Sequence, residues 1–179
     1  MSRTLIIAEH DGQNLNPSTA KCTNCASAIG QDCDIIVMGS DIGAIAGQAA
    51  AIDGVSSVIA VSADHLENPL AVNLASEVVA IADGYTHILG PSTTFGRDLM
   101  PQIAARLGVN QVSDIAAVED SHHFKRPIYA GNAIVDVTAP DGVTVVATVR
   151  VASWKAAGSS GSAAVEERAA SAPASDHSR

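Results

Sequence analysis

The sequence predicts a doubly wound, mostly parallel α/β domain, and three observations support this fold class. Short apolar runs rich in β-branched residues alternate four times with helical segments, and the connections are short. The chain has 179 residues, the length of one domain. Its hydrophobic fraction is 47% but its aromatic fraction only 3%. Ala, Val, Ile and Leu must therefore fill the core, as in strands buried on both faces.

Four strand–helix units are expected in order. The strands are predicted at residues 4–8, 35–38, 57–61 and 87–89, and the helices at residues 17–29, 42–52, 70–82 and 94–107. Asn16 and Pro17 supply a cap and a first-turn proline for the first helix, and Gly30 ends it. Pro101 lies inside the last helix, which should begin or kink near it. Short connections favour parallel neighbours with right-handed crossovers.

The pattern changes after a fifth apolar run at residues 115–118. Two β-branched runs, residues 134–138 and 143–149, flank the sequence Ala139-Pro-Asp-Gly142. A Pro-Asp-Gly turn between such runs predicts an antiparallel hairpin. The expected architecture is therefore a parallel sheet with an appended antiparallel hairpin.

The composition changes again near residue 156. Residues 156–179 are mostly Ala, Ser and Gly with scattered charges, and their only larger apolar residue is Val165. Such a segment buries too little apolar surface to offset its ordering entropy. We therefore expect one domain over residues 1–155 and a flexible linker or tail over residues 156–179.

Charge and hydropathy exclude several classes of partner. The formal net charge of −9 at pH 7 disfavours nucleic acid and anionic membrane surfaces. The most apolar stretch, residues 71–82, is interrupted by Asn73, Ser76 and Glu77. It falls short of the ~20 residues that a membrane span needs, so membrane insertion is not expected.

The three cysteines are Cys22, Cys25 and Cys33, an odd number. Only three residues precede the first expected strand, which leaves no room for an export signal. Reduced thiols in a cytosol-like compartment are therefore expected. The Cys22-x-x-Cys25 spacing is compatible with a redox pair. Both lie about two turns into a helix, however, which favours a structural role.

Three strand-end segments are candidate ligand sites. The turn after the first strand, residues 9–14, holds one glycine where a dinucleotide fingerprint needs three. Residues 39–43 (GSDIG) match no phosphate motif, and Ser92-Thr-Thr94 is the cap of a helix in its simplest interpretation. Glu9-His10-Asp11 and the pair His122-His123 carry acid–base groups, but no nucleophile is placed beside them by spacing. No catalytic or metal-binding residue is predicted.

The segment RPIYAGNA, residues 126–133, is more informative. It combines a cation, a fixed proline, an aromatic ring and a permissive glycine in one extended run. One interpretation is an edge strand with a bulge at Gly131. The other is a contact surface, because Arg and Tyr are enriched at interfaces. The interface candidates are Arg126, Pro127, Tyr129, Gly131 and Asn132.

This segment strongly resembles the alpha subunit of electron transfer flavoproteins. Other stretches agree with that family in the same order: Glu9-His10, Leu89-Gly-Pro-Ser-Thr-Thr94, Met100-Pro101, Ala104-Ala-Arg-Leu107, Val112-Ser-Asp-Ile115 and Thr148-Val-Arg150. The resemblance covers about residues 4–157. It implies a Rossmann-like fold of the adenine-nucleotide alpha hydrolase-like type.

The resemblance also implies partners and cofactors. In that family the alpha subunit pairs with a beta subunit, and a second alpha domain beyond a linker holds most of the FAD. The heterodimer carries electrons from flavin dehydrogenases, such as those of fatty acid β-oxidation acting on acyl-CoA, to a membrane quinone reductase. AMP, where present, lies in the beta subunit. The FAD-contacting segments have no counterpart here, so FAD is expected only at the level of the heterodimer.

The leading hypothesis is therefore an electron-carrier subunit that acts as a scaffold and is not an enzyme by itself. One alternative is a free-standing domain that binds a small molecule or an adenine nucleotide, as the strand-end glycines and hydroxyls suggest. Another is a hydrolase or redox enzyme that uses Cys22 and Cys25.

Overall fold

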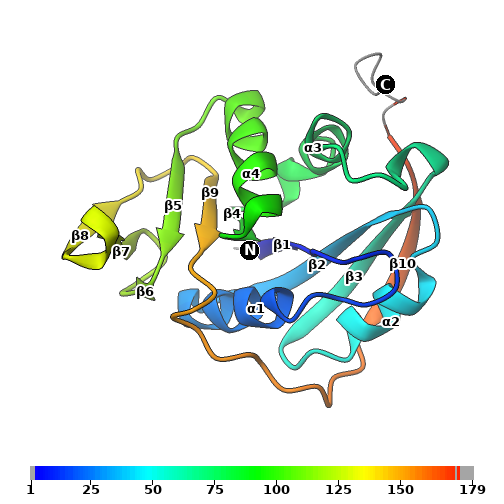
Figure 1. The fold of residues 1–179 in the computed structure, drawn as a ribbon, viewed down its shortest axis with the longest axis horizontal. Helices are drawn as coiled ribbons and strands as arrows, with labels where there is room; N and C mark the ends of the chain where they lie inside the picture. Colours follow the sequence, from blue (N-terminus) through cyan, green and yellow to red (C-terminus); the bar gives the residue numbers. More distant parts are fainter. Residues whose placement is uncertain (1–2, 172, 174–179) are drawn as a thin grey trace.

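A seven-stranded parallel sheet forms the centre of the computed structural model, which describes residues 3–171 and 173 (Figure 1). The strand order is β10-β3-β2-β1-β4-β9-β5, and every pairing between neighbours is parallel. The strands are β1 (Arg3–Ile7), β2 (Asp32–Gly39), β3 (Val55–Ser62), β4 (His87–Pro91), β5 (Gln111–Ile115), β9 (Val145–Val149) and β10 (Ala164–Ala169). The predicted doubly wound fold class is confirmed.

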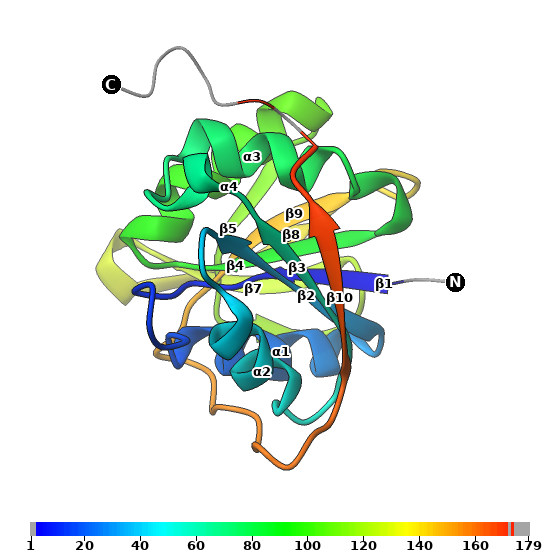
Figure 2. The same cartoon turned by 90° about the vertical axis from the view of Figure 1, so that its right-hand side faces the viewer.

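Helices cover both faces of this sheet. Figure 2 shows α1 and α2 on one side and α3 and α4 on the other. The helices are α1 (Ser18–Ile29), α2 (Gly43–Ala50), α3 (Ala71–Val79) and α4 (Thr94–Leu107), with short 3-10 turns η1 (Asp64–Leu66), η2 (Ala82–Gly84) and η3 (Tyr129–Gly131). As predicted from the sequence, α1 ends at Gly30, whose φ is 82°. Pro101 lies within α4 and does not end it.

Each face of the sheet has its own apolar core of small and branched side chains. The α1/α2 core includes Cys22, Ala26, Ile35 and Ala49, and the α3/α4 core is its counterpart across the sheet. Close packing requires glycine at the start of α4, because a Cβ on Gly96 would lie 1.8 Å from the Pro91 carbonyl oxygen. The first turn of α4 therefore lies directly against the end of β4.

A second sheet of three antiparallel strands adjoins the β5 edge. Its order is β6-β7-β8, with β6 (Ala117–Val118), β7 (His123–Ile128) and β8 (Ala133–Thr138). Phe124 on β7 is 1% exposed and joins the α1/α2 core. The small sheet is therefore anchored to the domain by an aromatic side chain.

The predicted hairpin between residues 134–138 and 143–149 is wrong. β8 pairs with β7 instead, and β9 lies between β4 and β5 in the parallel sheet. All five residues of β9 are buried, whereas exposure alternates along β8. A continuous apolar run belongs in the centre of a parallel sheet, and an alternating run belongs on a half-solvated antiparallel sheet.

The predicted flexible tail and the boundary at residue 155 are also corrected. The chain after β9 runs beneath α1 and α2, where Asp53 N–H donates to the Gly158 carbonyl and Gly161 N–H donates to the Ala51 carbonyl, at 2.9 and 2.8 Å. A Cβ on Gly161 would lie 2.6 Å from the Ile52 carbonyl oxygen, so only glycine fits there. The chain then adds β10 beside β3. Residues 172 and 174–179 of the predicted tail lie outside the described residues.

Candidate functional site

The hairpin tip, defined here as residues 126–134, gathers the interface candidates in one place. β7 and β8 are in register up to Ile128 and Ala133, and η3 closes the turn between them. Tyr129, Ala130 and Gly131 have consecutive φ values of 50°, 53° and 94°. The expected bulge at Gly131 is therefore replaced by a tight turn, in which Asn132 N–H donates to the Tyr129 carbonyl at 3.1 Å.

Large apolar side chains are exposed at this tip. Tyr129 is 78% exposed and Ile134 is 58% exposed. Pro127 lies directly across the ladder from Ile134, so both side chains share the outer face of the hairpin. The left-handed conformation of two non-glycine residues is energetically costly. An exposed apolar cluster on a costly turn is typical of a contact surface.

The two cations of β7 differ in their pairing. Lys125 Nζ lies 2.7 Å from Glu119 Oε1 and 2.5 Å from Asp136 Oδ1, and these hydrogen bonds raise the pKa of Lys125. Arg126 points to the opposite face of the strand. Its Nε is buried and has no hydrogen-bond partner within the described chain. Of these two neighbouring residues, Lys125 thus contacts two carboxylates, whereas Arg126 has a buried donor without a partner.

The switch point of the sheet lies between β1 and β4, where strand order reverses and doubly wound folds commonly bind ligands. Glu9 follows β1 there. Its Oε2 accepts from Ser18 Oγ at 2.9 Å and from Thr93 Oγ1 at 3.1 Å. Ser18 begins α1 and Thr93 is the N-cap of α4, as predicted for the Ser92-Thr-Thr94 segment. An internal carboxylate therefore faces the N-termini of two helices, where a ligand anion would otherwise be favoured.

The other acid–base groups after β1 are engaged in loop structure. His10 Nε2 lies 2.9 Å from the Met38 carbonyl oxygen, and its Nδ1 accepts from Gly12 N–H at 3.2 Å. Asp11 Oδ1 accepts from the N–H groups of Gln13 and Asn14, which lowers the pKa of the Asp11 carboxyl. This arrangement shapes a turn and aligns no base with a nucleophile.

The cysteines are structural. Cys22, Cys25 and Cys33 are all free and buried. Burial raises the pKa of Cys25 and of Cys33 to about 12, so neither thiol ionises near neutral pH. Among residues 3–171 and 173, no group of three or more His, Cys, Asp or Glu side chains is arranged to hold a metal ion.

Two polar contacts were not predicted because they join distant segments. His87 on β4 is 1% exposed, and its Nε2 lies 2.7 Å from the Ser121 carbonyl oxygen in the loop before β7. Burial lowers the pKa of His87.

The second contact joins β5 to the segment after β9. Asp114 on β5 has a φ of 63° and accepts from Arg150 Nη1 at 2.9 Å. His122 lies edge-on to His87, and His123 pairs with Asp120.

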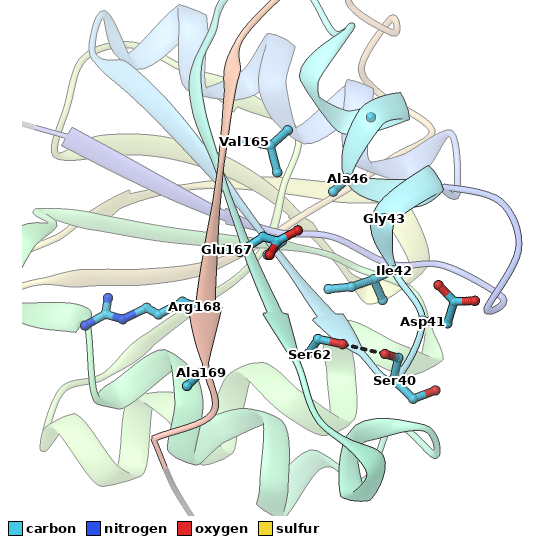
Figure 3. Close-up of a pocket in the computed structure, with 12 residues that line it drawn as sticks. Ser40, Asp41, Ile42, Gly43, Ala46, Ser62, Val165, Glu167, Arg168 and Ala169 are labelled. Carbon is cyan, nitrogen blue, oxygen red and sulfur yellow. Dashed lines mark hydrogen bonds between the residues drawn. The ribbon is translucent and has the colours of Figure 1, made fainter.

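A cavity of about 730 Å³ lies between α2, the end of β3 and β10. The GSDIG segment lines one side of it. Figure 3 shows Val165 and Glu167 pointing toward α2 and Arg168 pointing to the opposite side of β10. Ser62 Oγ donates to the Ser40 carbonyl at its rim.

These sites do not fit the FAD that the family resemblance implies. The carboxylates of Asp41 and Glu167 line the cavity, and the guanidinium of Arg168, which also lines it, points to the other side of β10. A pyrophosphate would need amides and cations inside the cavity instead. The carboxylate of Glu9 lies at the switch point and repels a phosphate for the same reason. Along the described part of the chain, no helix is long and apolar enough to cross a membrane.

Comparisons with known proteins identify the family. The sequence profile of the electron transfer flavoprotein domain matches residues 4–173. The chain is 40% identical over 164 residues to the electron transfer flavoprotein subunit alpha of Pseudomonas aeruginosa, covering 91% of this chain and 53% of that protein. It is 40% identical over 169 residues to that of Paracoccus denitrificans, covering 94% and 54%.

A mitochondrial relative gives the same result. The electron transfer flavoprotein subunit alpha of Dictyostelium discoideum is 37% identical over 171 residues, which cover 91% of this chain and 48% of that protein. The chain thus spans about half the length of the curated relatives that it matches, and it aligns with their N-terminal part. It belongs to the electron transfer flavoprotein family and corresponds to the N-terminal domain of the alpha subunit.

Proposed function

We propose that this domain pairs with the beta subunit of an electron transfer flavoprotein and that the hairpin tip is a principal contact. The observation that carries the proposal is the exposed apolar cluster at the tip, where Tyr129 is 78% exposed. Aromatic side chains and Arg are enriched among the residues that dominate binding energy. The name of the matched relatives, subunit alpha, supports a partner subunit.

The complete heterodimer would contain the FAD and act as an electron carrier, not as a catalyst of its own reaction. It would accept electrons from flavin dehydrogenases, among them those acting on acyl-CoA, and deliver them to a membrane quinone reductase. AMP would lie in the beta subunit. The compartment would be the bacterial cytoplasm or the mitochondrial matrix, matching the sources of the relatives.

This domain would contribute a scaffold. The closed switch point supports that assignment, because Glu9 is already hydrogen-bonded to Ser18 and Thr93. Phosphate or pyrophosphate binding would place a second anion beside this carboxylate, and repulsion in a partly buried site opposes it.

Co-expression with a beta subunit tests the proposal. The tagged chain should retain the beta subunit through affinity purification and size exclusion. The chain purified alone should show no flavin bands in its visible absorption spectrum. A chain that elutes unchanged in the presence of the beta subunit would refute the pairing, and flavin bound to the chain alone would refute the scaffold assignment.

Calorimetry separates this proposal from the alternative of a free-standing nucleotide binder. The cavity between α2 and β10 has room for a small molecule, about 730 Å³. Titration of the chain with millimolar AMP or ATP should nevertheless release no binding heat, because Asp41 and Glu167 line that cavity. A saturable heat would favour the alternative.

A further inference from the structure

Arg126 is placed unlike the other arginines of the described chain, which either reach acceptors or, like Arg168, are exposed. Alternation along β7 puts Phe124, Arg126 and Ile128 on the inner face of the hairpin, and Arg126 lies across from Val135. Its Nε is enclosed without an acceptor. In contrast, Arg3 contacts Asp34, and four further donors reach acceptors: Arg97 to Ser92, Arg106 to Ser76 and to the Val72 carbonyl, and Arg150 to Asp114.

The carboxylates near Arg126 are already used. Asp136 and Glu119 both contact Lys125, which occupies the outer face of the same strand. The alternation of the ladder keeps Asp136 on that outer face, so it cannot satisfy Arg126 without a change of register. Nothing within the described chain neutralises or caps this guanidinium.

An enclosed donor without an acceptor is costly, and native proteins satisfy most such groups. Arg126 adjoins the exposed Tyr129 and Ile134 and the half-buried Pro127, which the proposed docking would cover. A guanidinium desolvated there would need an acceptor from the partner. A carboxylate suits it best, because its two oxygens match the guanidinium fork and its charge offsets the lost hydration.

We propose that Arg126 forms an interface ion pair with an Asp or Glu of the beta subunit, and that the guanidinium turns out of the hairpin to do so. This inference rests on the proposed pairing. It adds that recognition depends on one cation, and not only on the apolar cluster around Tyr129. Lys125 takes no part in it, since two intrachain carboxylates hold it.

Affinity measurements with the beta subunit test the pair. Arg126→Leu should weaken binding about 100-fold, because a carboxylate on the partner is left desolvated and unpaired. Arg126→Lys should weaken it about tenfold, since the charge remains and the fork is lost. The matched control is Arg168→Leu on β10, an exposed arginine on the opposite edge of the domain, which should bind like the wild type.

Salt dependence and charge exchange complete the experiment. Added NaCl should weaken the wild type more than Arg126→Leu. Arg126→Glu should fail to bind until one acidic residue of the beta subunit is replaced by Arg. Binding of Arg126→Leu and Arg126→Lys within twofold of Arg168→Leu would overturn the ion pair while leaving the pairing intact. Absence of binding by the wild type would remove the pairing itself.

Discussion

At the switch point between β1 and β4 the polar side chains are paired within the chain, whereas at the hairpin tip they are not. Glu9 accepts from two helix-terminal hydroxyls. Arg126 has an enclosed donor without an acceptor, and Tyr129 is mostly exposed. The two regions show that a side chain of the protein itself can occupy the crevice where doubly wound folds commonly bind ligands, while the three-stranded sheet carries the surface suited to a partner.

The difference also separates stability from recognition. Polar groups satisfied inside the chain contribute to the free energy of unfolding, and their removal should leave partner affinity unchanged. Exposed groups at the tip contribute little to that free energy, and their removal should change affinity. Substitutions at the switch point are therefore expected to lower stability and leave affinity unchanged. Substitutions at the hairpin tip are expected to lower affinity and leave stability unchanged.

Removing the anchor of the small sheet should give the largest effect. Phe124 is 1% exposed and packs into the α1/α2 core. Phe124→Ala should lower the free energy of unfolding by about 3–5 kcal/mol, through lost burial and the cavity left behind. Urea unfolding at neutral pH measures it. A loss below about 1 kcal/mol would mean that the small sheet is not anchored by this side chain.

Truncating the exposed ring should affect only recognition. Tyr129→Ala should weaken binding to the beta subunit by about 2–3 kcal/mol, or roughly 30- to 150-fold, because an interface aromatic is lost. The melting temperature should not fall, because the Tyr129 side chain is 78% exposed in the chain alone. Leu70→Ala, another exposed apolar side chain far from the tip in sequence, serves as the control. Equal affinities for the two variants would contradict the assignment of the interface.

Neutralising the switch-point carboxylate should affect only stability. Glu9→Gln should lower the free energy of unfolding by about 1–2 kcal/mol, because two charge-assisted hydrogen bonds become neutral ones. Affinity for the beta subunit should be unchanged. Chemical denaturation of this variant is compared with Glu67→Gln, an exposed glutamate after η1. A loss of affinity in Glu9→Gln would place the switch point in the interface.

The smallest effect concerns the buried His87 of β4, which contacts the loop before β7. Because burial lowers the pKa of His87 from 6.5, the unfolded chain binds the proton more readily. Stability should therefore be full above the unfolded pKa and fall as pH decreases from about 7.5 to about 5.5. His87→Gln should flatten this slope, whereas the control His65→Gln should retain it. Thermal melting across this pH range decides between them.

The sequence was sufficient for what depends on local pattern. Four strand–helix units and the Gly30 stop follow from periodicity and cap residues, and the interface candidates are contiguous. The hairpin around residues 139–142 was mispredicted because a turn signal does not say whether its flanks pair with each other. β10 was missed because backbone hydrogen bonds and strand pairing, not buried side chains, order residues 156–171.

Contacts between residues that lie far apart in the sequence could not be predicted from local pattern. Glu9 and Thr93 are 84 positions apart, and only the meeting of β1 and β4 brings them together. The separation of His87 from Ser121 is 34 positions. The environment of Arg126 depends on the pairing of β7 with β8. The sequence analysis instead predicted that residues 134–138, now part of β8, pair with residues 143–149.

Hydrogen exchange of the chain, with and without the beta subunit, tests the central contrast most directly. Binding should slow exchange of the amides in residues 126–134 and leave residues 8–18 unchanged. Slower exchange at residues 8–18 and around Thr93, with no change at the hairpin tip, would contradict the account.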